Sequence, residues 1–370
     1  MTINNQSIGI ALSGGGYRAT LFGLGSLWRL NEVGLLGRMD RITSVSGGSI
    51  LAGILAHGWS KLNFTDGRAD NFVDEVAHRV QSFCSKTIDI EAGLKGKLAP
   101  FKTAGEFLSD RYKKDLFGST KLKDIPDASA GNAPKFIFYA TNMQTGRSFR
   151  FRQDMVADYV LGISRTVDVS LADVVAASSA FPPIFSPIIL RTNPDSWDNP
   201  DKDFPGLNKL RKRIVLADGG VYDNMGLESL VDKVDLVLVS DAGAPFEIDE
   251  SPFEDDLLQL GRVRDILIDQ TRALRKRWLM SDLAAGRKVG AYWGIGTQID
   301  DFHAPGALTR DSAFTAELES IPTRLCEFDE KDQGHLINWG YALADAALRT
   351  RAGLDFGPEA SWPVPLWGLR

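Results

Sequence analysis

Residues 42–49 (ITSVSGGS) place a serine in a setting suited to nucleophilic attack. An apolar run leads into Ser46, two glycines follow it, and an apolar helical pattern begins directly afterwards. Small neighbours permit the sharp strand-to-helix turn of a nucleophile elbow, and the helix N-terminus favours alkoxide character. The usual pattern has glycine two residues before the serine, where this chain has Ser44, so Ser44 and Ser49 stay open as nucleophiles. The alternative is a turn that merely begins a core helix.

Residues 13–18 (SGGGYR) form a second candidate element between a strand-like and a helix-like run. Consecutive glycines let the backbone approach a bound group, and the helix N-terminus presents unpaired N–H donors. The loop lacks the Gly-Lys-Ser/Thr ending of a P-loop and the G-x-G-x-x-G spacing. An oxyanion hole at Gly14, Gly15 and Gly16 therefore fits better than a nucleotide cradle, with Arg18 available for a substrate phosphate. A tight turn without function is the alternative.

Residues 216–221 (LADGGV) end an apolar strand in Asp218, with two glycines that leave space beside the carboxylate. Site residues collect at strand ends in α/β sheets, although an aspartate that only caps a turn is more common. A serine nucleophile needs a base, and the usual partner is histidine. The four histidines are poorly placed for this role: His57, His78, His303 and His335. The sequence therefore favours a carboxylate base, and we expect no histidine-like limb of activity near pH 6.5.

Alternating strand and helix patterns must position these residues. The strands are predicted at residues 8–12, 41–45, 136–141, 147–152, 184–190, 213–217, 234–240 and 289–295. The helices are predicted at residues 17–33, 48–59, 71–84, 104–116, 171–180, 253–285 and 334–349. No linker-like segment separates them, so we expect one three-layer α/β/α domain over residues 1–370, with a mainly parallel central sheet. Residues 64–133 are predicted as a helical cap or insertion, and residues 191–212 as an exposed loop excursion.

Composition narrows the class of protein. The 370-residue chain carries a formal charge of −6, which argues against general nucleic-acid binding. No stretch approaches the roughly 20 apolar residues of a membrane span, and the N-terminus lacks the pattern of a signal peptide. The two cysteines, Cys84 and Cys326, favour a reducing compartment over a disulfide framework. No cluster has metal-ligand spacing, and we expect no cofactor. These features predict a cytoplasmic protein.

The ordered combination of a Gly-Gly-Gly-x-Arg loop, an elbow serine about thirty residues later and a downstream Asp-Gly-Gly resembles the patatin-like phospholipases, which share this pattern with cytosolic phospholipase A enzymes. Residues 177–185 (ASSAFPPIF) and 140–146 look like further family signatures. The resemblance covers about residues 8–243, and the predicted helix at 334–349 also resembles bacterial members. It implies a patatin-like fold.

The family's mechanism is a Ser–Asp dyad. Carried over by motif, Ser46 attacks an ester carbonyl and Asp218 takes its proton, while backbone N–H groups of the glycine loop hold the oxyanion. Arg18 would hold a lipid phosphate. This chain departs from many members at Ser44 and at Ala19, where glycine is usual.

The expected substrate is a phospholipid or lysophospholipid, reached by peripheral contact with the inner face of a membrane. A basic amphipathic helix within residues 257–283 could bind anionic lipid. The alternative that we favour is packing of its apolar stripe on the sheet, and the lysine-rich residues 95–123 are another contact surface. Rival functions are a lysophospholipase or esterase on soluble substrates, an effector switched on by an unknown ligand or protein, an inactive scaffold, and a nucleotide-binding protein.

Overall fold

Five parallel strands form the centre of a mixed sheet, in the order β5-β2-β1-β12-β13. We describe residues 6–88, 103–201, 204–246, 248–252, 255–354 and 359–369 of a computed structural model of the chain. The central strands are β1 (Ile8–Leu12), β2 (Arg41–Val45), β5 (Lys135–Asn142), β12 (Leu236–Asp241) and β13 (Val289–Gly294). Their apolar composition matches burial on both faces, as expected of parallel strands.

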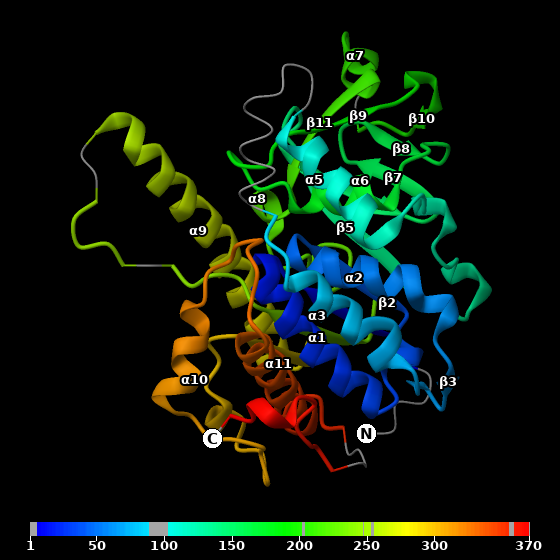
Figure 1. The fold of residues 1–370 in the computed structure, drawn as a ribbon. Helices are drawn as coiled ribbons and strands as arrows, with labels where there is room; N and C mark the ends of the chain where they lie inside the picture. The colour runs from blue at the N-terminus through cyan, green and yellow to red at the C-terminus, as the bar shows by residue number, and fades with distance from the viewer. Residues whose placement is uncertain are drawn as a thin grey trace.

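Antiparallel strands extend the sheet beyond β5. One series continues through β6 (Arg147–Arg152), β7 (Met155–Asp158), β8 (Gly162–Ser164) and β10 (Trp197–Asp198). A second pair, β9 (Ile188–Arg191) and β11 (Arg213–Asp218), joins through β11 to the far end of β5. A separate hairpin consists of β3 (Phe64–Thr65) and β4 (Arg68–Ala69). The predicted strands therefore form, and the antiparallel part lies at one end of the molecule (Figure 1).

Helices cover both faces of the sheet, which confirms the three-layer α/β/α prediction (Figure 1). One layer contains α1 (Gly16–Glu32), α2 (Gly47–Gly58), α3 (His78–Cys84), α5 (Ala104–Tyr112), α6 (Leu171–Ser179) and α11 (Glu330–Thr350). The other face is covered by α8 (Gly220–Asp223) and the C-terminal part of α9 (Asp256–Ala284). The short helices α7 (Leu207–Lys212) and α10 (Ala313–Glu317) complete the set. Within the described residues, no helix combines the length and apolar composition that crossing a bilayer would require.

The two apolar cores follow from the alternation of side chains along the strands. In β12, Leu236 and Leu238 belong to the large core under α1, α2 and α11, whereas Val237 and Val239 belong to the smaller core under α9. Helices α1 and α11 pack closely because Gly25 lies against the backbone of the facing helix, where a Cβ atom would meet the Ile337 carbonyl oxygen at 1.9 Å. The fold thus holds α1, and the glycine loop before it, firmly in place.

Two predicted segments differ from expectation. The strand predicted at residues 184–190 begins only at Ile188, because the prolines at 182, 183 and 187 cannot donate to a ladder. The excursion predicted at residues 191–212 is only partly exposed, since Trp197 is buried in β10 and pairs with β8.

The cap predicted at residues 64–133 is described in part, because residues 89–102 lie outside the described residues. Its helices α3 and α5 pack into the helical layer, α3 beside α1 and α5 beside α6.

Candidate active site

Ser46 occupies a strained turn between β2 and α2. Its backbone angles are φ 51° and ψ −118°, a conformation that non-glycine residues rarely adopt. Such strain is typical of a nucleophile elbow, in which the turn presents the side chain at the start of a helix. Ser44 and Ser49 are fully buried and donate or accept hydrogen bonds within the protein. Of these three serines, Ser46 alone lines the adjoining pocket.

Strand β5 brings Ser46 and Asp218 together. Along one side of β5, Tyr139 pairs with Val45 at the end of β2, and the next residue, Ala140, pairs with Asp218 at the end of β11. Because β2 runs parallel and β11 antiparallel to β5, the carboxyl ends of the two strands meet head to head. The sequence indicated both strand ends, but their opposition depends on the direction of β11, which no local pattern specifies.

Burial changes the acidity of Asp218. Loss of solvent raises the pKa of its carboxyl group to about 7, while the Gly220 N–H and the Ser46 hydroxyl act in the opposite direction. The Gly220 N–H donates to Oδ1 at 2.6 Å. Oδ2 accepts no hydrogen bond of normal geometry from a protein group within the described ranges. A carboxylate with a pKa near neutrality and a free oxygen beside a serine hydroxyl can act as a general base.

The glycine loop and the elbow fit against each other without room for side chains. A Cβ atom on Gly47 would meet the Gly16 carbonyl oxygen at 2.0 Å, and one on Gly48 would meet the Leu12 carbonyl oxygen at 2.3 Å. Gly15 and Gly16 both have positive φ, at 144° and 56°. This packing explains why two glycines follow Ser46 and places the loop directly beside Ser46.

The three predicted oxyanion donors are not equivalent. The Gly14 N–H donates to the Asn224 carbonyl oxygen at 2.9 Å and is therefore occupied. For the N–H groups of Gly15 and Gly16, no protein acceptor is found in the described parts of the chain, and both residues line the pocket. The Gly14 assignment is thus corrected, and Gly15 and Gly16 remain as the donors that could hold an oxyanion.

Arg18 does not face the pocket, which contradicts its predicted role at a substrate phosphate. Its side chain is 1% exposed, and burial lowers the pKa of its guanidinium group to about 10. The Nη1 atom donates to the carbonyl oxygens of Glu319 and Ile321 at 2.6 Å each, and Nη2 donates to that of Ala242 at 2.9 Å. Position 18 lies in the first turn of α1, where the side chain points into the protein. Arg18 therefore holds two loops against the glycine loop.

Ser178, whose role sequence reasoning missed, hydrogen-bonds to the backbone of Ser46 and to that of Gly219, the residue after Asp218. Its hydroxyl oxygen accepts from the Ser46 N–H at 3.1 Å, and its carbonyl oxygen accepts from the Gly219 N–H at 3.1 Å. The hydroxyl also hydrogen-bonds to Ser49 at 2.8 Å, and Ser49 donates to Ser44 at 2.9 Å. The serine in place of the usual glycine at position 44 thus belongs to a buried hydroxyl chain that supports the elbow. The only sequence signal was that residue 178 falls within the signature at residues 177–185.

Replacing Ser178 with alanine is expected to lower kcat on a soluble ester about three- to tenfold with little change in KM. The substitution leaves the Ser46 N–H buried without its acceptor, which costs about 1–3 kcal/mol and loosens the elbow. Steady-state kinetics and urea unfolding measure the two effects. Ser26→Ala is the control, because Ser26 is also buried and hydrogen-bonded, to Ser240 and Trp293, away from the site. Equal losses of kcat in both variants would contradict a positioning role for Ser178.

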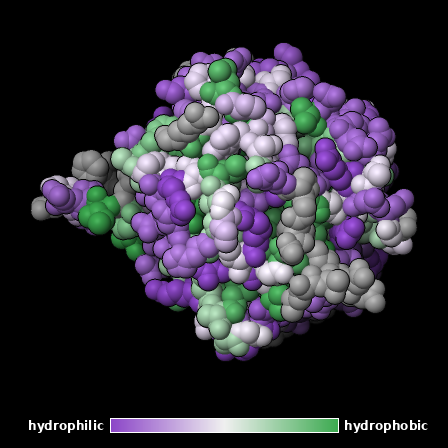
Figure 2. All heavy atoms as spheres, turned by 90° about the horizontal axis from the view of Figure 1, so that it is seen from below, coloured by the Kyte–Doolittle hydropathy of each residue, from purple (hydrophilic) through white to green (hydrophobic). Residues whose placement is uncertain are grey.

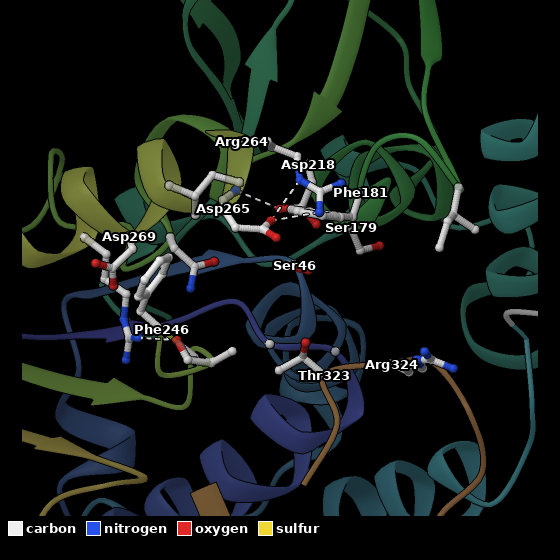
Figure 3. Close-up of a pocket in the computed structure, with 18 of the residues that line it drawn as sticks. Ser46, Ser179, Phe181, Asp218, Phe246, Arg264, Asp265, Asp269, Thr323 and Arg324 are labelled. Carbon is white, nitrogen blue, oxygen red and sulfur yellow. Dashed lines mark hydrogen bonds and ion pairs between the residues drawn. The ribbon is translucent and has the colours of Figure 1, made fainter. Parts of the chain in front are cut away.

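A pocket of about 430 Å³ opens over Ser46 and Asp218 (Figure 3). Its apolar wall includes Phe181, Ile184 and Phe185, from the proline-rich segment after α6. Charged side chains surround the mouth: Arg262, Arg264, Asp265, Asp269, Arg272 and Arg324. In Figure 3, Ser46 lies between Phe181 and Arg264 on one side and Thr323 and Arg324 on the other. No described residue of 64–133 lines this pocket.

Helix α9 forms one side of the pocket, which the sequence did not indicate. Arg264 lies 5.4 Å from the centre of the Phe181 ring and donates to the Pro182 carbonyl oxygen at 3.4 Å. None of the four histidines lines the pocket. His57 contacts Thr120 through Nδ1 at 3.2 Å, and His335 packs against Phe314 and Trp367. The arrangement brings together a strained serine, a buried carboxyl group and unpaired N–H donors. These are the groups that acyl transfer through a serine requires.

Comparison with protein families agrees with this chemistry. Residues 10–231 match the family described as patatin-like phospholipase, which covers more than half of the chain. The chain therefore belongs to the patatin-like phospholipase family, and the resemblance inferred from its motifs is confirmed. Members of this family are serine hydrolases that act on lipid esters. A comparison with curated proteins found no significant match.

Solved structures with the same fold include human GIVD cytosolic phospholipase A2, with a TM-score of 0.52 and 14% sequence identity. The alignment covers 94% of this chain and 59% of the human one, so this chain spans less than two thirds of that protein. The same human enzyme in complex with methyl gamma-linolenyl fluorophosphonate aligns with a TM-score of 0.50 and 16% identity, over 94% of this chain and 57% of that one. VipD from Legionella pneumophila gives a TM-score of 0.40, with 16% identity over 94% of this chain and 67% of that one.

Proposed function

We propose that this protein hydrolyses the carboxylic ester bonds of phospholipids, with Ser46 as nucleophile and Asp218 as general base. The proposal depends on one observation. The strand that ends before Ser46 and the strand that ends in Asp218 pair with adjacent residues of β5, and both residues line the same partly apolar pocket. Family membership supports lipid esters as the substrate class. The reaction requires no cofactor, since serine, carboxylate and backbone donors supply each step.

The proposed reaction proceeds through an acyl-enzyme. The Ser46 hydroxyl oxygen attacks the ester carbonyl carbon while its proton moves to Oδ2 of Asp218. The N–H groups of Gly15 and Gly16 stabilise the negative oxygen of the tetrahedral intermediate, a contribution of about 3 kcal/mol per donor. As the intermediate collapses, the lysolipid alcohol leaves with the proton from Asp218. Water then attacks the acyl-enzyme with Asp218 again as base, which releases the fatty acid and restores Ser46.

Arginines at the pocket mouth replace Arg18 as the groups that would meet a lipid phosphate. Arg324 lines the pocket beside the glycine loop. Its carbonyl oxygen accepts a hydrogen bond from the Tyr17 N–H at 3.1 Å. Arg264 borders the opposite side, near Phe181. A phosphate between these walls would orient the ester toward Ser46, because guanidinium groups bind phosphate oxygens strongly.

Phospholipid hydrolysis is expected from the wild type and not from Ser46→Ala. The measurement is mass-spectrometric analysis of mixed phospholipid vesicles incubated with each protein, which also identifies the acyl position that is cut. Free fatty acid with lysolipid from the wild type alone supports the proposal, and further turnover of lysolipid would add lysophospholipase activity. Equal turnover by both proteins would exclude Ser46 as the nucleophile. If neither acts, the chain alone does not have the proposed activity, and a required activator becomes the next hypothesis.

A further inference from the structure

Helix α9 exposes an apolar stripe that no described part of the chain covers. Most of the large apolar side chains that are exposed in the described residues lie between residues 246 and 280. Five of them share one side of the helix: Leu260, Val263, Leu267, Leu274 and Trp278. At about 100° per residue, these five positions fall within about 60°, roughly a sixth of the circumference of the helix. The expectation that this stripe packs on the sheet is therefore wrong.

The other side of α9 is fixed to the protein by buried contacts. Arg272 donates to Oδ2 of the fully buried Asp241 at 2.9 Å and to the Ala244 carbonyl oxygen at 2.6 Å. Arg275 lies 3.6 Å from the carboxylate of Asp223. Leu279 packs into the smaller core. These contacts hold the stripe facing outward, and the N-terminal part of α9 projects from the body of the protein (Figure 1).

The stripe is continuous with the mouth of the active-site pocket. On the same helix, Arg264 and Ile268 line the pocket, one residue after Val263 and Leu267 of the stripe. At the rim of the pocket, Ile184 and Phe246 are themselves exposed apolar side chains. In Figure 2, the projection at the left carries a group of hydrophobic residues beside hydrophilic ones. An apolar surface therefore leads along α9 to the opening above Ser46.

The basic residues of α9 are largely engaged within the protein. Arg264 pairs with Asp265 at 2.7 Å, Arg262 stacks on Phe246 at 4.2 Å and Lys276 on Tyr292 at 4.6 Å. In addition, residues 247–256 (EIDESPFEDD) hold six carboxylates and no basic residue. Negative charge in the sequence next to α9 weakens the attraction of this part of the chain to anionic headgroups. Three of the basic side chains that the sequence indicated, Arg262, Arg264 and Lys276, thus already have partners within the protein, which weakens their attraction for anionic lipid.

We propose that the α9 stripe docks the protein on a bilayer of zwitterionic phospholipid and aligns the pocket mouth with the lipid surface. This inference rests on the proposed function, because the lipid is identified as the partner from the chemistry of the adjoining pocket. Apolar burial drives the docking, in the manner of interfacial amphipathic helices. A second copy of the chain bound to the stripe would lie beside the exposed rim of the pocket, where substrate must enter. A lipid surface on the stripe therefore fits the position of the pocket better than a second copy does.

Vesicle flotation of Ser46→Ala protein tests the docking separately from hydrolysis. With phosphatidylcholine vesicles, adding Leu260→Ser, Leu267→Ser and Leu274→Ser is expected to reduce binding at least about tenfold. Tyr159→Ser with Leu366→Ser is the control, because both residues are exposed apolar side chains elsewhere and should leave binding unchanged. Binding should change less than about twofold between about 0.05 and 0.5 M salt, and should not strengthen when about a third of the lipid is phosphatidylserine.

Hydrolysis of a water-soluble short-chain ester by the same variants, with Ser46 intact, shows whether the site has survived. Unchanged soluble-ester activity with lost flotation supports the proposal. Unchanged flotation of the stripe variant overturns it, as does binding that requires anionic lipid. A dimer that the stripe variant dissociates, seen by analytical ultracentrifugation without vesicle binding, would assign the stripe to a second copy instead. If the wild type hydrolyses no ester, the flotation of Ser46→Ala still decides the docking, so the two proposals fail separately.

Discussion

Asp218→Asn is expected to lower kcat about 10²- to 10⁴-fold and, at pH 8, to raise the free energy of unfolding. Activity falls because an amide cannot accept the Ser46 proton. Stability rises because the variant removes a carboxylate that must ionise in a buried position. Burial lifts the folded-state pKa of Asp218 to about 7, against an ordinary value of 3.8. A raised pKa favours the protonated folded state, so the stability from Asp218 is fully present below the unfolded pKa and is lost as the pH rises through about 7.

The two effects have separate measurements. Between pH 4 and 8 the ionisation of Asp218 costs the wild type on the order of 4 kcal/mol, and urea unfolding should show the advantage of Asp218→Asn growing across that range. Asp158→Asn is the control. Asp158 is also buried, but its oxygens accept hydrogen bonds from Asn142, Thr145, Val160 and Leu161, so this variant should lose stability and keep activity. Full activity in Asp218→Asn would remove Asp218 from the dyad.

The kcat/KM for a soluble ester is expected to fall about tenfold per pH unit below about 7, because only ionised Asp218 can accept the serine proton. The sequence predicted no histidine-like limb near pH 6.5, and the limb expected here belongs to Asp218 and not to a histidine. The pH profiles of wild type, His57→Gln and His335→Gln should coincide. Burial lowers the pKa of both histidines, and neither lines the pocket. A limb that disappears in one of these variants would point to a histidine base.

The local elements of the site were predictable because each depends on short-range chemistry. The strand-to-helix turn at Ser46 and the glycine loop require small residues at fixed positions, and those residues are visible in the sequence. Asp218 was predictable as a strand end, but its contact with Ser46 depends on the pairing of β11 with β5. The fold class followed from the alternation of strand and helix patterns.

The errors arose where tertiary packing decides the role of a side chain. Arg18 has the charge for a phosphate, yet its position in the first turn of α1 directs it to carbonyl oxygens of segments more than 200 residues away. The stripe of α9 was expected to be buried and is exposed. An amphipathic pattern in the sequence does not indicate whether the apolar side of the helix packs on a sheet or faces outward. Ser178 was missed because the signature at residues 177–185 does not indicate which backbone groups a serine within it contacts.

The Ser46–Asp218 dyad is tested most directly by peptide mapping after reaction with a long-chain alkyl fluorophosphonate, which modifies an activated serine covalently. We expect a single adduct, on Ser46, that forms rapidly in the wild type and much more slowly in Asp218→Asn. A principal adduct on Ser44, Ser49 or any other residue, or equal rates in the two proteins, would contradict the Ser46–Asp218 dyad.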